Sequence, residues 1–212
     1  MKGNLIIISS PSGGGKGTLI REILRSVPDL AYSVSFTTRE SRFGEEHGRD
    51  YHFISMDRFR EKIAAGDFLE YAEVHGNFYG TSFEETERKL SEGQDVILEI
   101  DVQGAIQVME KLAENLVSIF IMPPSFDVLR ARLTARNTEK PEELALRLRN
   151  AHDEVAEFQR FSYVVINDDV ASASRKLASI IIAERQRRIR QTEAIKDIMG
   201  SFERSKHSNS GE

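Results

Sequence analysis

LIIISSPSGGGKGT, residues 5–18, joins a short aliphatic run to a glycine-rich loop. Four apolar residues follow at helical spacing, Leu19, Ile20, Ile23 and Leu24, so the region predicts a strand, a loop and a helix. Glycines let backbone N–H groups converge on phosphate oxygens, and the N-terminus of the helix adds partial positive charge. A flexible linker would not lie between a buried strand and an amphipathic helix, so the loop predicts binding of a nucleoside triphosphate.

The loop departs twice from the pattern G-x-x-x-x-G-K-[ST], because Ser10 replaces the first glycine and Gly17 replaces the hydroxyl residue. Lys16 occupies the lysine position of this pattern, from which its side chain can reach the β- and γ-phosphates of a bound nucleotide. Gly17 removes the usual hydroxyl ligand of Mg²⁺, which leaves Thr18 as the nearest hydroxyl and water as the filler. Mg²⁺ is therefore expected with ATP, and no residue is assigned as its ligand. The residues expected to bind ATP here are Pro11, Ser12, Gly13, Gly14, Gly15, Lys16, Gly17 and Thr18.

The composition is that of a globular protein that can bury one core. The chain has 212 residues, 40% hydrophobic and 30% charged. The absence of cysteine excludes disulfides, and a net charge of -5 argues against binding of nucleic acid backbones. The apolar runs fall short of the roughly 20 residues that cross a bilayer, and the N-terminus lacks signal-peptide features. We expect a cytoplasmic protein with no membrane or nucleic acid partner, and the sequence leaves its oligomeric state open.

Further strand-length apolar runs occur at 95–100, 117–122 and 163–166, with helical stretches between them. Such runs are typical of buried parallel strands. The expected fold is an α/β P-loop type parallel sheet flanked by helices, with an inserted small subdomain and a helical lid. The expected division is a core of 1–32, 94–125 and 160–190, a subdomain of 33–93, a lid of 126–159 and a partly disordered C-terminal extension of 191–212.

The segment 33–93 differs from the rest in having short aromatic-rich strands. A hairpin turn is expected at Gly76-Asn77, and a helix over 57–65 is expected to end at Gly66. Arginine, tyrosine and small hydroxyl side chains gather in SVSFTTRESRFGEEHGRDYHF, residues 33–53. Because arginine forks suit phosphate groups, this stretch predicts a second substrate site.

Three stretches closely resemble guanylate kinases: residues 33–53, FLEYAEVHGNFYGTS at 68–82 and VILEIDVQG at 96–104. The resemblance runs from about Leu5 to about Ala183, and several motifs in the same order make it specific. It implies an enzyme that transfers a phosphoryl group from ATP to GMP, and also to dGMP, in purine nucleotide metabolism.

The resemblance also implies roles for single residues. It implies that Arg39, Arg42, Tyr51 and Tyr79 hold the phosphate of GMP, that Ser35, Glu70 and Thr81 read its guanine, and that Glu45 belongs to the same site. The chemistry agrees, because guanine presents N1–H and N2–H₂ donors that a carboxylate such as Glu70 accepts. Adenine would instead direct the lone pair of its N1 at the ionised Glu70. The unpaired carboxylate would then cost roughly 1–3 kcal/mol of binding free energy.

Plainer interpretations of these side chains stay open. The two arginines could form surface salt bridges, and the two tyrosines could pack within strands. The available salt-bridge partners are Glu40, Glu45 and Glu46. Found together within one motif, the four side chains favour phosphate binding.

Glu99 and Asp101 are two residues apart, so they are expected on one face of a strand near the carboxyl end of the sheet. Either carboxylate could organise Mg²⁺-bound water or contact the acceptor nucleotide, and the resemblance favours Asp101 at the substrate. A carboxylate that caps the following helix is the structural alternative.

Arginines of the expected lid complete the set of candidate residues. Arg132 and Arg136 are four residues apart on one helix face, and Arg147 follows a break at 137–141. The resemblance assigns these three to a mobile segment that closes over ATP, where they would stabilise charge on the transferred group. Asn167 would contact the adenine by the same resemblance, and capping of the next helix is its alternative.

Together these features predict in-line transfer from ATP to GMP, with Lys16, Arg39 and the lid arginines as catalytic residues. Two rival functions are each opposed by particular residues. A kinase for AMP or a sugar phosphate is opposed by the pairing of Ser35 with Glu70. A non-catalytic module that binds phosphopeptides is opposed by Lys16 and the lid arginines.

Overall fold

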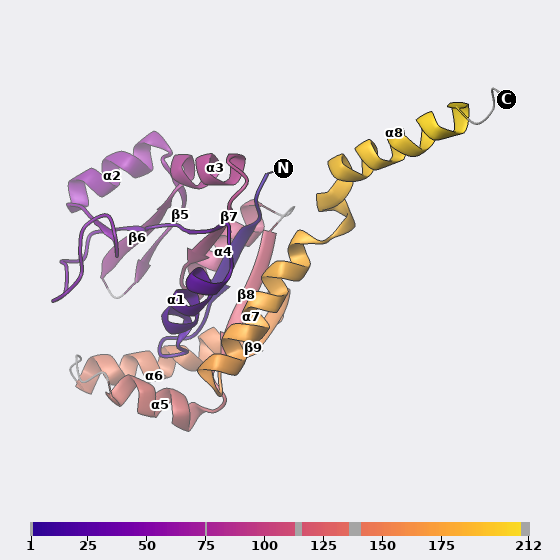
Figure 1. The fold of residues 1–212 in the computed structure, drawn as a ribbon. Coiled ribbons are helices and arrows are strands. Elements are labelled where there is room, and N and C mark those ends of the chain that lie inside the picture. Colours follow the sequence, from indigo (N-terminus) through magenta and orange to yellow (C-terminus); the bar gives the residue numbers. More distant parts are fainter. Residues whose placement is uncertain (1, 75, 113–115, 136–140, 209–212) are drawn as a thin grey trace.

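A five-stranded parallel sheet lies at the centre of the computed structural model, which describes residues 2–74, 76–112, 116–135 and 141–208 (Figure 1). The strand order is β2-β7-β1-β8-β9. The strands are β1 (Leu5–Ser9), β2 (Leu30–Tyr32), β7 (Asp95–Glu99), β8 (Leu116–Met122) and β9 (Tyr163–Ile166). Ile8 of β1 pairs with Glu99 on one side and Ile119 on the other. The carboxyl ends of the strands therefore share one edge, where ligands of open α/β sheets bind.

Helices cover both faces of this sheet. Alternate residues of β1 enter two separate cores, Ile6 and Ile8 on one face and Leu5 and Ile7 on the other. The first core also takes residues from α1 (Lys16–Ser26) and α7 (Val170–Arg185). The second takes residues from α3 (Phe83–Ser91) and α4 (Val102–Lys111). The expected α/β sheet with flanking helices is confirmed.

A second, four-stranded sheet has the order β4-β3-β6-β5. Its strands are β3 (Phe36–Thr37), β4 (His52–Phe53), β5 (Phe68–Val74) and β6 (Asn77–Ser82), and α2 (Met56–Ala65) packs on it. Phe59 of α2 is fully buried, with its ring centroid 4.6 Å from that of Phe68. A Cβ at Gly80 would lie 3.0 Å from each of these rings, so the contact between helix and sheet requires glycine there.

Two turn predictions in this sheet can be compared with the structure. β5 and β6 form the expected antiparallel hairpin, with Val74 paired to Asn77, so Asn77 belongs to the strand and not to the turn. Gly76 has a φ of 76°. Gly66 ends α2 in the left-handed conformation, as the sequence predicts.

The helices α5 (Phe126–Ala135) and α6 (Pro141–Ala156) lie together at the end of the molecule opposite α2 (Figure 1). Leu129 and Leu133 of α5 pack with Ala151 of α6 in a small separate core, and the short helix η1 (Glu157–Arg160) follows. The predicted break at 137–141 falls largely outside the described residues. None of the described helices is long and apolar enough to cross a membrane.

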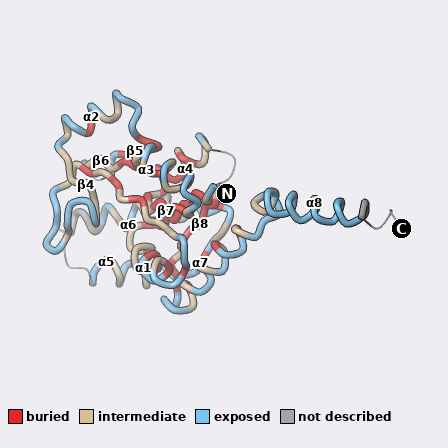
Figure 2. The backbone as a smooth tube through the Cα atoms, turned by 45° about the horizontal axis from the view of Figure 1, so that its top comes forward, coloured by how far each residue is buried: buried red, intermediate tan, exposed pale blue. Residues whose placement is uncertain are grey.

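The C-terminal extension is described as far as residue 208. After the short helix η2 (Arg188–Gln191), the structure describes 192–208 as a helix, α8 (Thr192–Ser208). It extends away from the body of the molecule in two views (Figures 1 and 2). Apolar residues recur at helical spacing over 195–202, although the last residues of the chain are polar. This periodic pattern is typical of a helix.

Candidate functional site

Two glycines hold the phosphate loop in a conformation that other residues disfavour. Gly13 and Gly15 have φ of 83° and 89°, in the left-handed region. A Cβ at Gly15 would lie 2.4 Å from Nδ2 of Asn167, so overlap also excludes alanine. Gly15 is the N-cap of α1, which begins at Lys16. The loop and the positive end of α1 line one cleft, an arrangement that suits a polyphosphate.

The carboxylate of Glu99 lies beside Lys16 and Gly17. Its Oε1 is 3.8 Å from Nζ of Lys16 and 3.3 Å from the position that a Cβ at Gly17 would take. The hydroxyl of Tyr32 donates to Oε2 of Glu99 at 3.2 Å. Burial raises the pKa of Tyr32, so the phenol stays a donor. A carboxylate from β7 thus lies next to the position where a P-loop usually has a hydroxyl side chain.

Asp101 does not share a strand face with Glu99. β7 ends at Glu99, and Asp101 is the N-cap of α4, where its Oδ1 accepts from the N–H of Gly104 at 2.9 Å. The prediction of two carboxylates on one strand is wrong, because the chain leaves the sheet after Glu99. The capping alternative describes Asp101, and both carboxylates still line the same cleft.

Asn167 and Arg132 support the loop through its backbone. Nδ2 of the buried Asn167 donates to the carbonyl oxygen of Gly14 at 2.8 Å. Arg132 donates through Nη2 to the carbonyl oxygen of Asn167 at 2.9 Å and through Nη1 to that of Gly14 at 3.5 Å. The N-cap of α7 is Asp169, so the alternative in which Asn167 caps that helix is wrong. The two side chains position the loop from outside the cleft.

Ser12 connects the loop to α6. Its N–H donates to Oε2 of Glu154 at 3.0 Å, and its Oγ accepts from Nη1 of Arg147 at 3.3 Å. Loop amides of this kind are donors for phosphate, so the carboxylate of Glu154 holds one of them here. Arg147 and Glu154 line the cleft, whereas Arg136 lies outside the described residues.

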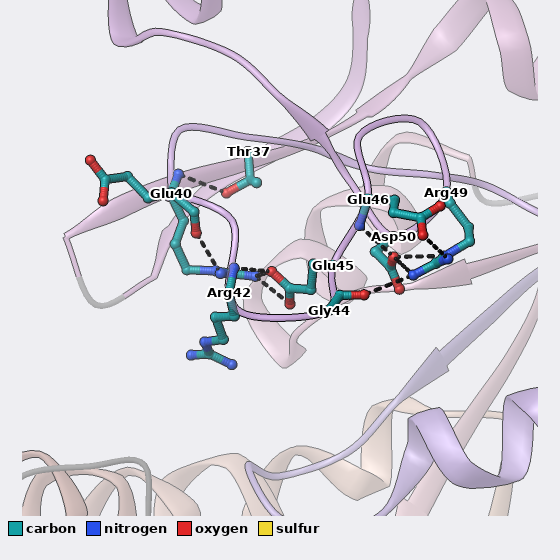
Figure 3. Close-up of polar contacts among 9 residues, drawn as sticks. Thr37, Glu40, Arg42, Gly44, Glu45, Glu46, Arg49 and Asp50 are labelled. Atoms are coloured by element: carbon teal, nitrogen blue, oxygen red, sulfur yellow. Dashed lines mark hydrogen bonds and ion pairs between the residues drawn. The ribbon is translucent and has the colours of Figure 1, made fainter.

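Arg39 is held by the loop that follows β3. Its Nη2 donates to both carboxylate oxygens of Glu45, at 2.9 and 3.0 Å, and Nη1 donates to the carbonyl oxygen of Glu40 at 2.7 Å. Glu45 also accepts from the backbone N–H of Arg42 at 2.8 Å, while the guanidinium of Arg42 points away from it (Figure 3). The salt bridge predicted as an alternative for Arg39 is therefore present, and it fixes the guanidinium at the cleft.

A second cluster orders the same loop. Arg49 contacts Glu46 at 2.7 Å and Asp50 at 2.8 Å, and it donates to the carbonyl oxygen of Gly44 (Figure 3). Each contact is exposed and therefore worth little alone. Together they join residues 44–46 to residues 49–50 within the loop that carries Arg42 and Glu45.

Tyr51 and Tyr79 lie against Arg39 at the cleft wall. Their ring centroids are 5.9 Å apart at a steep angle, and the guanidinium carbon of Arg39 lies 5.4 Å from the Tyr51 centroid. Burial raises the pKa of Tyr51 to about 12. Its hydroxyl is thus a proton donor at neutral pH, as an anion site requires.

Glu70 is a buried carboxylate at the inner end of the same cleft. It is 3% exposed, and the hydroxyl of Thr81 donates to its Oε1 at 2.6 Å. Burial raises the pKa of Glu70 to about 7. A Cβ at Gly104 would lie 2.8 Å from its Oε2, so glycine on α4 makes room for the carboxylate. Ser35 is buried and lines the cleft nearby.

All these groups border one cleft of about 680 Å³. It runs from the phosphate loop past Glu99 and Asp101 to Arg39, Tyr79 and Glu70. The predicted site residues line it, with few exceptions. Those exceptions are Pro11, Gly14, Thr81, Arg132 and Asn167, together with the undescribed Arg136.

Known proteins carry the same sequence pattern over nearly the whole chain. The family model described as guanylate kinase matches residues 2–184. The chain belongs to the guanylate kinase family. It is 47% identical over 197 residues to the guanylate kinase of Geobacter sulfurreducens, covering 93% of this chain and 97% of that one. It is 50% identical over 198 residues to the guanylate kinase of Neisseria meningitidis, covering 93% and 96%.

A solved structure shows the same fold. The crystal structure of guanylate kinase from Anaplasma phagocytophilum superposes with a TM-score of 0.76 at 34% identity and covers 89% of each chain. The resemblance stated from the sequence is confirmed, and the chain is an enzyme of the nucleoside monophosphate kinase class.

Sequence reasoning missed several residues that line the cleft, among them the polar residues Tyr32, Arg49, Asp50 and Glu154. Arg49 and Asp50 lie inside the quoted stretch 33–53 and could have been found there. Nothing in the sequence signals Tyr32 or Glu154, because each reaches the cleft from an element distant from its partner.

The oxygen ligands near the phosphate loop suit a metal ion that is held mainly by the substrate. Among the described residues, no group of three or more His, Asp or Glu side chains could hold a metal ion by itself. Near the loop, the carboxylate of Glu99 and the hydroxyl of Thr18 offer oxygen atoms as metal ligands. The Thr18 hydroxyl also accepts a hydrogen bond from Nη2 of Arg21 at 3.3 Å. This set suits Mg²⁺, which keeps waters and uses few carboxylates with substrate phosphates.

Proposed function

We propose that the chain transfers the γ-phosphoryl group of ATP to GMP, and also to dGMP, giving ADP and GDP or dGDP in purine nucleotide metabolism. The observation that carries the proposal is the buried Glu70 with its Thr81 partner, which borders the same cleft as the phosphate loop. One cleft thus offers a polyphosphate site at one end and a base-reading carboxylate at the other.

Glu70 supports guanine as the acceptor base. An ionised carboxylate accepts from N1–H and N2–H₂ of guanine, while Thr81 donates a further hydrogen bond to its Oε1. Adenine offers a lone pair at N1, so the buried carboxylate would be left without a hydrogen-bond donor. This would cost roughly 1–3 kcal/mol of binding free energy. Because the sugar is not needed for this contact, the deoxy nucleotide is expected to be accepted too.

Arg39 and Arg42, with Tyr51 and Tyr79, are proposed to hold the acceptor phosphate. Glu45 fixes Arg39 through a bidentate pair, so we assign Glu45 to positioning of the guanidinium. Preorganised donors of this kind bind an anion without first having to be ordered. We propose that the shared cleft holds the acceptor phosphate in line with the donor.

The transfer itself needs no covalent enzyme intermediate. A phosphate oxygen of GMP attacks the γ-phosphorus, the bond to the β–γ bridging oxygen breaks, and ADP leaves. Lys16 and the loop amides hold the donor, and Arg132 and Arg147 are assigned to the same end. Mg²⁺, when bound with ATP, neutralises the phosphates, and Glu99 and Asp101 are the carboxylates that would hold it through water.

The division of the chain into core, acceptor subdomain and lid is part of this proposal. Helices α5 and α6 contact the loop through Leu133, Arg147 and Glu154. We assign them to a lid that covers ATP and excludes water, which limits hydrolysis. Binding of ATP is expected to release the Ser12 N–H from Glu154, because that amide then serves a phosphate.

A coupled assay of ADP release tests the function. ATP is supplied with GMP, dGMP, AMP, CMP or UMP in parallel, and turnover is expected with GMP and dGMP. Equal rates with AMP and GMP would refute the guanine assignment. Binding of a phosphopeptide without turnover of any monophosphate would instead indicate a non-catalytic module.

A further inference from the structure

Ser12 of the phosphate loop makes two contacts with helix α6. Its N–H donates to Oε2 of Glu154 at 3.0 Å, and its Oγ accepts from Nη1 of Arg147 at 3.3 Å. Arg147 and Glu154 are seven residues apart on α6, so they project from the same face of the helix, about two turns from each other. One face of α6 thus brings a cation and an anion to a single loop residue.

The acceptor of the Ser12 N–H is an anionic group inside the nucleotide cleft. Ser12, Arg147 and Glu154 all line this cleft. The amides of a glycine-rich loop bind phosphate oxygens, and a carboxylate oxygen accepts the same charge-assisted hydrogen bond. On this amide, the carboxylate of Glu154 therefore occupies the place of a phosphate oxygen.

The position of Ser12 within the loop indicates which phosphate would take its amide. Helix α1 begins at Lys16, and loop amides next to such a helix cradle the α- and β-phosphates. Ser12 lies at the other end of the loop, the end that contacts α6. The amide of Gly14 donates to the carbonyl oxygen of Pro11 at 2.9 Å and is thus used within the loop. This arrangement leaves the Ser12 amide for the terminal phosphate of a triphosphate.

The contact at Ser12 involves both lid helices. A Cβ at Gly13 would lie 2.9 Å from Cγ of Leu133, so α5 packs against the loop at the next residue. Leu133 packs in turn with Ala151 of α6 in the small core that joins the two helices. The hydrogen bond from Ser12 to Glu154 therefore ties the helix pair, and not a single side chain, to the loop.

We propose that Glu154 is a positioning residue that distinguishes ATP from ADP. The proposal deepens the proposed function and rests on ATP as the donor. The γ-phosphate of ATP takes the Ser12 amide and repels the carboxylate, so Glu154 leaves the loop. ADP lacks this phosphate, so Glu154 keeps the amide as it does in the free protein. The position of the lid helices thus depends on whether the nucleotide still carries the group to be transferred.

This role has a consequence for the affinities of the two nucleotides. Only ATP has to break the charge-assisted hydrogen bond between Ser12 and Glu154, and the free energy spent on this is lost from its binding. ADP leaves the bond intact, so the bond contributes equally before and after ADP binds. Removal of the charge should therefore favour ATP selectively, whereas a purely structural role of Glu154 would affect both nucleotides alike.

Calorimetric titration of the full chain with Mg²⁺ and either ADP or the β,γ-imido analogue of ATP, in the absence of GMP, tests the proposal. Glu154→Gln keeps the shape and an acceptor oxygen but removes the charge. Affinity for the triphosphate analogue should rise about fivefold, because a neutral acceptor binds the amide less strongly than a carboxylate. Affinity for ADP should change less than about twofold.

Asp153→Asn is the matched control, because it removes the neighbouring, exposed carboxylate of the same helix. It should change the affinity for either nucleotide less than about twofold. The amide proton of Ser12 provides a second measurement by NMR. Glu154→Gln should shift its resonance in the free and the ADP-bound protein, and leave it in place when the triphosphate analogue is bound.

The results separate the role of Glu154 from the choice of donor. If both nucleotides bind and Glu154→Gln changes their affinities equally or not at all, the role of Glu154 is overturned and ATP stays the donor. A Ser12 resonance that responds to the variant in the triphosphate complex would also overturn it. If the unmodified chain binds neither nucleotide, the proposed donor is overturned, and this role with it.

Discussion

The two ends of the cleft are built in different ways. The end proposed for the donor consists mainly of consecutive residues of the phosphate loop, and its shape depends on glycines such as Gly13 and Gly15. The end proposed for the acceptor consists of side chains from β5, β6 and the loop between β3 and β4, with Arg39, Tyr79 and Glu70 brought together only by the second sheet. A backbone site is thus encoded locally, whereas a side-chain site depends on strand pairing.

Lys16→Ala should give the largest effect, because it removes the charge that stabilises the transferred group at the donor end. We expect kcat to fall by about 10²–10³, with the KM for GMP nearly unchanged. Steady-state kinetics with both substrates varied would measure this. Lys176→Ala, an exposed lysine on α7, is the control, and a matching loss there would point to a general effect of charge.

Gly15→Ala tests whether the donor end depends on backbone shape. Gly66→Ala provides the comparison, because both glycines have positive φ but a Cβ at Gly66 meets nothing within 4 Å. Gly66→Ala should destabilise the fold by roughly 1 kcal/mol, and Gly15→Ala by roughly 1–3 kcal/mol more through overlap with Asn167. Urea unfolding measures both, and equal losses would contradict the tight contact seen at the loop.

Glu70→Gln tests the acceptor end through one side chain. The KM for GMP should rise about 5- to 150-fold, which corresponds to 1–3 kcal/mol, while the KM for ATP stays nearly constant. Glu73→Gln is the matched control, since Glu73 lies on the same strand but is exposed. A rise in the KM for ATP instead would show that the acceptor site is misplaced.

The raised pKa of Glu70 makes GMP binding pH-dependent. Burial raises that pKa to about 7 in the free protein, and guanine needs the ionised form. The contribution of Glu70 to GMP affinity should therefore be constant above about pH 7 and fall about tenfold per pH unit below it. Because the folded state holds this proton more tightly than the unfolded state, the group stabilises the fold at low pH, and this contribution is lost as pH rises toward 7.

Calorimetric titration of GMP from pH 5.5 to 8 measures the dependence. The same titration of Glu70→Gln is the control and should keep only the dependence that comes from the phosphate of GMP, whose second pKa is about 6. A variant with the same slope as the unmodified protein would assign the titration to a group other than Glu70.

Tyr32→Phe should give the smallest effect, because it removes one hydrogen bond to Glu99 and leaves the ring in place. We expect a loss of about 0.5–1.5 kcal/mol, seen as a 2- to 12-fold weaker response to Mg²⁺ in a titration at fixed ATP. Tyr163→Phe is a matched control outside the cleft, since its hydroxyl donates to Glu184. Equal changes in both variants would indicate a general effect on stability.

The sequence predicted the elements whose signals are local. Glycine spacing, apolar periodicity and helix stop signals gave the loop at 10–18, the segments that form β1, β7, β8 and β9, and the end of α2 at Gly66. The resemblance to guanylate kinases added the acceptor residues, and the structure brings most of them to one cleft. Each of these features depends on residues close together in the sequence or on a short motif that is matched as a whole.

The sequence by itself thus determined the donor loop, the fold class and the family, because backbone conformation and apolar period are set by nearby residues. Only the tertiary structure placed Asn167 behind Gly14, Glu154 on Ser12 and Tyr32 on Glu99. Each of these contacts joins residues whose approach depends on where a strand ends and how helices pack. Such contacts leave no periodic signal, so no local pattern could predict them.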